Sequence, residues 1–189
     1  MTVVDTRGQR SLVAQRQAPL RALYATHPEA ALTYKWARTS SADLAPLDDP
    51  FHTRVEVGRE HPITLRLGID RRVGGLGDLP NPGDLLCAAL AACEDGTIRM
   101  IADVLGVRLT TLEVEVQGTV DVRGCLGVDP HAQVGFTGFW STARLQPAAD
   151  TPPRLFDKLI ETTKRVCVNL DTLQRPNTIE LIVDSQSAR

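Results

Sequence analysis

One stretch, residues 79–105, constrains the fold of this 189-residue chain more than any other part. It reads LPNPGDLLCAALAACEDGTIRMIADVL. Asn81 suits a helix N-cap, Pro82 the first helical position, and Gly106 the residue that ends a helix. The pattern predicts one helix of about 24 residues. Its first half is apolar on every side, and such a helix must be surrounded by protein.

Strand-like segments lie on both sides of this predicted helix, which favours an α+β fold with antiparallel sheets. Residues 61–70, HPITLRLGID, alternate apolar and polar side chains as a half-buried strand does. A second long helix is expected to begin with Thr151 as its cap and to end before Pro176. The remaining expected elements are a polar tail over 1–18, a short helix over 19–25, strands over 31–40, 51–57, 112–123, 134–145 and 178–184, and a hairpin loop over 123–133.

The order of elements also predicts how the chain is organised. We expect an N-terminal extension, residues 1–50, with a short helix and a strand, followed by one domain over residues 51–189. An all-round apolar helix needs more cover than one small sheet provides. A homodimer whose shared core encloses the two long helices is therefore the expected assembly.

Charge and composition exclude several classes of protein. The chain has 21 Lys and Arg against 23 Asp and Glu, a net charge of -2, and no basic run that would bind nucleic acid or an anionic membrane. The longest apolar run, residues 85–93, is too short to span a bilayer, and the N-terminus lacks a signal peptide. Scattered histidines and cysteines without CxxC spacing predict no metal site and no cofactor. We expect a soluble, cytoplasmic protein.

Two of the four cysteines, Cys93 and Cys167, lie on the apolar faces of the two predicted helices. A free cysteine in such a place often acts only as a small hydrophobic residue. It can also act as a nucleophile once it is ionised, since a thiol of ordinary pKa is only a few per cent thiolate at about pH 7. Cys87 lies mostly off the face of Cys93, and Cys125 lies in the predicted hairpin loop, so packing is the favoured role for both.

Two segments resemble the OsmC/Ohr family of proteins. NPGDLLCAALAAC resembles the family signature in which an Asn-Pro pair begins a central helix that contains a reactive cysteine, and KRVCVNLDTLQRP resembles the helix with the second cysteine. The similarity extends over about residues 61–184, roughly two thirds of the chain. It implies an intertwined homodimer with active sites at the subunit interface, and thiol-dependent reduction of organic hydroperoxides, sometimes hydrogen peroxide, in defence against oxidative stress.

The resemblance assigns a role to each site residue. Cys93 would be the peroxidatic cysteine and Cys167 the resolving one, and a lipoyl-type dithiol would reduce the disulfide that they form. Arg72, with Arg71 as the alternative, would be the cation that favours the thiolate, because Cys93 lies too far from the helix N-terminus for the dipole to act. Asp84 would either hold this arginine or cap the helix.

The sequence departs from the family pattern near the expected site. Gly83 replaces the glutamate that follows the Asn-Pro pair, and Val168 replaces the proline that follows the second cysteine. Glu94 and Asp95 follow Cys93 directly, and their charges would oppose thiolate formation if they lie near the sulfur. Two alternatives therefore stay open: another thiol activity, such as a hydrolase or a disulfide exchanger that uses Cys93 with Glu94 nearby, and a non-enzymatic binder of a small apolar ligand at the dimer interface.

Overall fold

A computed structural model describes residues 11–42 and 44–184 of the chain as an α+β fold built around one long helix. Two antiparallel sheets accompany this helix, one of three strands in the order β1-β2-β3 and one formed by β4 and β5. The elements are α1 (Leu12–Thr26), the 3-10 turn η1 (Pro28–Ala31), β1 (Ala37–Thr39), β2 (Thr53–Val57), β3 (Ile63–Leu67), the 3-10 turn η2 (Arg71–Val73), α2 (Pro82–Leu105), β4 (Leu109–Val120), α3 (Val122–Cys125), β5 (Phe136–Pro147), α4 (Pro153–Val166) and α5 (Val168–Gln174).

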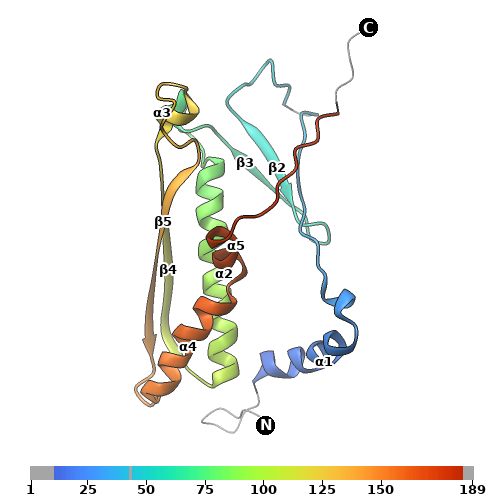
Figure 1. Ribbon diagram of the computed structural model, residues 1–189, viewed down its shortest axis with the longest axis vertical. Helices are drawn as coiled ribbons and strands as arrows, with labels where there is room; N and C mark the ends of the chain where they lie inside the picture. Colours follow the sequence, from blue (N-terminus) through green and yellow to red (C-terminus); the bar gives the residue numbers. More distant parts are fainter. Residues whose placement is uncertain (1–10, 43, 185–189) are drawn as a thin grey trace.

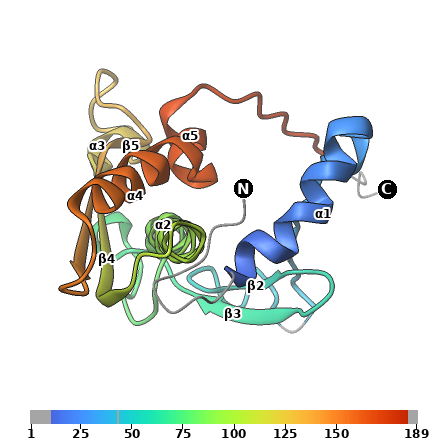
Figure 2. The ribbon, with the colours of Figure 1, turned by 90° about the horizontal axis from the view of Figure 1, so that it is seen from below.

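The long helix α2 packs beside the β4–β5 hairpin, and α4 and α5 pack on α2 from another side (Figures 1 and 2). The three-stranded sheet, α1 and the segment after α5 stand apart from this layer, so the single chain has an open side (Figure 1). Such an open side leaves one face of α2 without protein cover. Leu86 in the first half of α2 and Met100 in its second half are exposed in the single chain; the sequence predicted that the cover of the first half comes partly from a second copy.

The predicted start and end of α2 are confirmed. The Asn81 side chain accepts hydrogen bonds from the Gly83 and Asp84 amides, and the Asp84 carboxylate accepts one from the Asn81 amide at 2.9 Å. This capping box satisfies amides that the helix cannot pair itself. Gly106 ends the helix at φ 69, a left-handed conformation that glycine adopts without strain.

The β4–β5 hairpin forms the wall against which α2 packs. Its strands pair from Leu109 opposite Pro147 to Val120 opposite Phe136, and the connection contains the short helix α3. Apolar residues of β4 alternate toward α2, because successive side chains point to opposite faces of a sheet. At the lower end they join the core, whose buried members are Ile98, Ile101, Ala102, Val107 and Leu159.

The N-terminal part differs from its prediction. The helix α1 begins at Leu12 rather than near residue 19, so residues 12–18, predicted as a polar tail, are helical; residues 1–10 lie outside the described part of the chain. Ser11 caps α1, and Asp103 of α2 accepts hydrogen bonds from the Ser11 hydroxyl at 2.5 Å and from the Val13 amide at 2.9 Å. A carboxylate from a distant helix therefore stabilises this start, which local sequence patterns do not reveal.

The second predicted long helix is two helices. It breaks at Cys167, whose ψ of 112° is extended, so α4 ends at Val166 and α5 begins at Val168. The expected Thr151 cap is also wrong, because α4 has no side-chain cap hydrogen bond and its N-cap residue is Pro152. Two β-branched valines flank the break, and such residues have lower helix propensity.

The predicted strand over residues 178–184 is not formed within the single chain. Ile179, Leu181, Ile182 and Val183 are 76–90% exposed along an extended path. In the segment 31–40, only Ala37–Thr39 pairs as a strand. A strand needs a neighbour to accept its hydrogen bonds, and the described chain places none beside residues 178–184.

Candidate active site

The structure brings two of the predicted site residues, Cys93 and Cys167, into direct contact. The Cys167 thiol donates to the Cys93 sulfur, and the two Sγ atoms are 3.5 Å apart. Cys167 is 0% exposed and Cys93 is half-buried. Neither thiol is in a disulfide. One sulfur is therefore sheltered while its neighbour stays within reach of solvent.

Each cysteine reaches this contact from a defined position on a helix. Cys93 lies on the face of α2 that contacts α4 and α5, together with buried Leu90 and Thr97. Cys167 lies at the break between α4 and α5, where its amide donates to the Thr163 carbonyl at 3.1 Å. In α5, the Asn169 side chain donates to the Ala89 carbonyl of α2 at 2.8 Å.

Burial raises the pKa of the Cys167 thiol above its ordinary value. The Leu170 amide opposes this change, the neighbouring Cys93 adds to it, and the Thr97 hydroxyl opposes it. A thiol with a raised pKa keeps its proton at neutral pH and can donate it to a neighbouring sulfur. The geometry is therefore asymmetric, with Cys167 as the donor and Cys93 as the acceptor.

The two acids that follow Cys93 are both engaged elsewhere. Glu94 is 7% exposed and accepts a short hydrogen bond from the Ser141 hydroxyl of β5. Asp95 forms an ion pair with Arg99 one turn along α2, with Nε 2.5 Å from Oδ1. The Glu94 partner lies on β5, whereas Cys167 approaches from the α4 side. Residue spacing alone could not reveal the Ser141 contact, because Ser141 lies on a distant strand.

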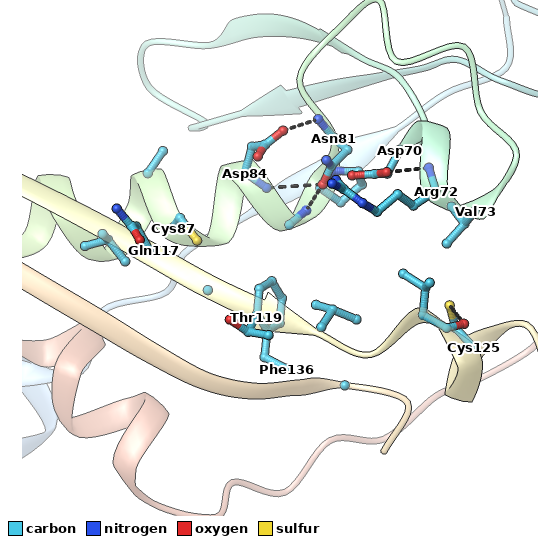
Figure 3. A pocket seen from close by; sticks show the side chains of 18 of the residues that line it. Asp70, Arg72, Val73, Asn81, Asp84, Cys87, Gln117, Thr119, Cys125 and Phe136 are labelled. Carbon is cyan, nitrogen blue, oxygen red and sulfur yellow. Dashed lines mark hydrogen bonds between the residues drawn. The ribbon is translucent and has the colours of Figure 1, made fainter. Parts of the chain in front are cut away.

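A pocket of about 1140 Å³ lies beside the start of α2, between this helix and the far end of the hairpin. Figure 3 shows α2 and the loop before it forming one wall and the β4–β5 strands the other. Arg72, Asp84 and Cys87 are among the residues that line it, and Cys93 and Cys167 are not. The structure thus places the predicted site residues in two locations, a thiol pair and a separate pocket.

Arg72 and Asp84 occupy one end of this pocket (Figure 3). The Arg72 amide donates to the Asp70 carboxylate at 2.7 Å, and the Asp84 carboxylate is used in the capping box. Arg71, the alternative to Arg72, instead donates its guanidinium to the Leu76 carbonyl at 3.2 Å. Of the two arginines, Arg72 is therefore the one whose side chain has no hydrogen bond or ion pair within the described chain.

The structure gives a steric reason for glycine at position 83. A Cβ atom there would lie 2.9 Å from the Asn81 side-chain oxygen and 3.2 Å from the Phe136 ring. Phe136 also packs over Gly118, where an added Cβ would lie 2.5 Å from the ring. The aromatic ring fills the space that a larger side chain at position 83 would need.

Cys87, for which the sequence favoured a packing role, lines this pocket. Burial, and after it the negative charge of Asp84, raise the pKa of the Cys87 thiol. Cys125, which lies across the pocket from Val73 (Figure 3), donates its thiol to the Val122 carbonyl. The helical spacing already indicated that Cys87 and Cys93 lie on different faces of α2. The sequence could not show that Cys87 lines a pocket, because residues of the folded β4–β5 hairpin form the opposite wall.

The loop that leads into α2 is held by a histidine between two carboxylates. The two ring nitrogens of His52 lie 2.8 Å from Asp49 and 3.1 Å from Asp78. The hydrogen bonds to Asp49 and then Asp78 raise the pKa of His52, although its burial acts in the opposite direction. In residues 11–42 and 44–184, no group of three or more potential ligand side chains could hold a metal ion.

These features define a class of protein: an α+β fold in which a long central helix presents a thiol to a second thiol from the helical segment that follows the hairpin. The sequence pattern of the family described as OsmC-like protein matches residues 75–182, more than half of the chain. The chain belongs to this family.

Solved structures share the fold. An organic hydroperoxide resistance protein OsmC from Legionella pneumophila is 20% identical, with a TM-score of 0.54 over 76% of this chain and 90% of that one. An OsmC-like protein from Mycoplasma pneumoniae is 15% identical, with a TM-score of 0.54 over 75% and 88%. An OsmC-like protein of unknown function from Vibrio cholerae is 10% identical, with a TM-score of 0.55 over 75% and 94%.

At these identities the likeness supports the fold, which confirms the α+β class with antiparallel sheets. The match to the family pattern confirms the predicted family. The comparison with curated proteins gives no match. Among the helices of the described chain, none combines the length and apolar character needed to cross a membrane.

Proposed function

We propose that this protein is a thiol peroxidase that reduces organic hydroperoxides, and hydrogen peroxide as a smaller substrate of the same reaction, through Cys93 and Cys167. The 3.5 Å separation of the two sulfur atoms is the observation on which the proposal depends. A disulfide requires sulfurs about 2.05 Å apart, so these atoms need to approach by only about 1.5 Å. Membership of the OsmC-like family supports the same reaction class.

The reaction has two oxidative steps. The Cys93 thiolate attacks the terminal oxygen of the hydroperoxide, which bears the hydrogen, and the O–O bond breaks. Cys93 becomes a sulfenic acid, and the leaving alkoxide takes a proton to form the alcohol. The Cys167 sulfur then attacks the Cys93 sulfur, the S–O bond breaks, and water leaves as the disulfide forms. The hydroperoxide gains two electrons and the two thiols lose them.

A dithiol reductant completes the cycle by thiol–disulfide exchange. Two electrons from a lipoyl-type dithiol would restore both cysteines, and the dithiol would itself become a cyclic disulfide. Cys93 is half-buried and Cys167 fully buried, so attack at the Cys93 sulfur is favoured by access. We place this cycle in cytoplasmic defence against oxidative stress.

We propose that the working form is a homodimer. The apolar residues of segment 178–184 are 76–90% exposed in the single chain, and one face of α2 is also uncovered. Monomeric proteins rarely expose apolar surface of this extent. A second copy would cover both regions, and sedimentation analysis at micromolar concentration would report twice the mass of one chain.

Arg72 and Asp84 have proposed roles in the same reaction. Arg72 lines the separate pocket, of which Cys93 is not part in the single chain. Its proposed role is to supply positive charge that favours the Cys93 thiolate, and Asp84 would fix the first turn of α2 through the capping box. Arg72→Ala should slow Cys93 oxidation at least five-fold. Arg71→Ala is the matched control, because Arg71 already uses its guanidinium on Leu76.

Thiol counting after addition of one equivalent of cumene hydroperoxide tests the proposal directly. We expect rapid loss of two thiols and a linked Cys93–Cys167 peptide by mass spectrometry. Cys93→Ser should abolish the reaction. Cys167→Ser should stop it at the sulfenic acid, which dimedone would trap. Four thiols still free after minutes would refute the peroxidase function.

The same variants separate the alternatives. A disulfide exchanger or a hydrolase that needs Cys93 alone would keep its activity in Cys167→Ser. The pocket beside Cys87 favours the second candidate function, a non-enzymatic binder of a small apolar ligand, because its volume suits such a molecule. A binder would retain ligand affinity in both serine variants.

We also propose the division of the chain into an extension, residues 1–50, and an OsmC-like domain, residues 51–189.

A further inference from the structure

The helix α5 is attached to α2 by few polar contacts. Within the described residues, the hydrogen-bonding contacts that join the segment 167–174 to α2 are few: those of the Cys167 thiol with the Cys93 sulfur and the Thr97 hydroxyl, and the bond from Asn169 Nδ2 to the Ala89 carbonyl at 2.8 Å. Only seven residues form α5, and it contains no buried residue. A helix this short has little stability of its own, so its position depends on such contacts.

The acceptor of the Asn169 bond is also part of the backbone that positions Cys93. In an α-helix each amide donates to the carbonyl four residues earlier, so the Ala89 carbonyl accepts the Cys93 amide. The same oxygen has a second lone pair, which receives the Asn169 amide group. One oxygen atom therefore joins the backbone of Cys93 to a side chain only two residues beyond Cys167.

We propose that Asn169 is a positioning residue that fixes the Cys167 sulfur against the Cys93 sulfur and thereby sets the rate and equilibrium of disulfide formation. This inference rests on the proposed function. Cys167 is the residue at which α4 ends and α5 begins, and its extended backbone is a natural point for rotation of α5. Without the bond to Ala89, α5 would move about this point and the two sulfurs would be in contact for a smaller fraction of the time.

Asn169→Asp tests the role with almost no change in shape. It replaces the amide donor with an oxygen that faces the Ala89 carbonyl, so attraction becomes repulsion. The matched control is Asn177→Asp, because Asn177 donates to the Thr172 and Arg175 carbonyls, both within its own segment. Asn169→Ala is the second variant: it removes the bond without adding charge and favours the helix.

The first readout is the equilibrium of the Cys93–Cys167 disulfide against a glutathione buffer, measured on the full chain without any peroxide. We expect Asn169→Asp to lower the effective concentration of the thiol pair about ten-fold, which corresponds to about 30 mV. Asn169→Ala should lower it about five-fold. Asn177→Asp should stay within two-fold of the wild type. A purely structural role would lower stability without changing this equilibrium in the folded protein.

The second readout separates the two oxidative steps with cumene hydroperoxide. Sulfenic acid formation, trapped by dimedone in the Cys167→Ser background, should be unchanged by Asn169→Asp. Disulfide formation with both cysteines present should slow by about ten-fold, and sulfenic acid should accumulate. If Asn169→Asp and Asn169→Ala both stay within two-fold of the wild type in the glutathione equilibrium and in the rate of disulfide formation, the inference is overturned. The peroxidase function would remain intact.

The opposite failure is also recognisable. If glutathione oxidises the pair but cumene hydroperoxide does not oxidise Cys93, the peroxidase function fails, and the glutathione equilibrium still decides the role of Asn169. If the wild-type pair forms no disulfide in glutathione buffer, there is no coupled pair to position, and both proposals fall.

Discussion

The buried carboxylate of Glu94, directly after the proposed nucleophile, offers a sharp test of the packing between α2 and β5. Its side chain is 7% exposed and accepts a hydrogen bond from the Ser141 hydroxyl. Ser141→Ala would leave this buried acceptor without that bond. The loss of a hydrogen bond to a charged group costs about 1.5–3 kcal/mol, and we expect about 2 kcal/mol here because Ser141 itself is exposed enough for water to replace part of the bond.

A loss of about 2 kcal/mol should lower the Tm by about 4–8 °C for a chain of this size. The assay is urea and thermal unfolding followed by circular dichroism at one fixed protein concentration, since a dimer makes stability depend on concentration. The double variant Glu94→Leu with Ser141→Ala removes both polar partners. It should cost less than Ser141→Ala alone, because replacement of both partners by apolar groups is close to neutral.

The order of these two stabilities is the decisive result. If the double variant is less stable than Ser141→Ala, or if Ser141→Ala costs less than about 0.5 kcal/mol, Glu94 does not depend on Ser141 and the reasoning is refuted. Ser40→Ala is the control: it alters an exposed serine after β1 and should stay within about 0.5 kcal/mol of the wild type.

Three further perturbations test other parts of the fold. Leu159→Ala, at a core position that is 0% exposed, should lower the free energy of unfolding by about 3 kcal/mol in urea titrations; a cost under about 1 kcal/mol would contradict its place in the core. The raised pKa of His52 gives the wild type stability that is present in full below about pH 6.5 and is lost as pH rises through that pKa. His52→Asn removes this stability, so the Tm difference from the wild type should shrink above neutral pH. An equal Tm difference at pH 6 and pH 9 would refute the ionised contact with Asp49 and Asp78. Asp103→Ala removes the acceptor that caps α1, so hydrogen exchange should quicken in α1 and not in α2; unchanged exchange in α1 would show that the cap is dispensable.

Local sequence patterns predicted the central helix with both its ends, since the capping chemistry of Asn81 and Asp84 and the left-handed Gly106 are encoded by adjacent residues. The same applies to the hairpin, where alternation along β4 and β5 reflects one covered face. The break at Cys167 was missed because the apolar spacing continues through it and the flanking valines lower helix propensity only slightly, so packing against α2 decides where the helix turns.

The candidate site shows the same division. The sequence by itself determined the identity of the thiols, the face of α2 on which Cys93 lies, and, by resemblance, the family to which the chain belongs. Tertiary structure alone decided that the two sulfurs meet at 3.5 Å, that Arg72 and Cys87 share a separate pocket, and that Glu94 turns to Ser141. The physical reason is the range of the forces. Caps and periodicity act within a few residues, whereas the contacts of Glu94 with Ser141 and of Cys93 with Cys167 join positions 47 and 74 residues apart and exist only once the helices and the hairpin have packed.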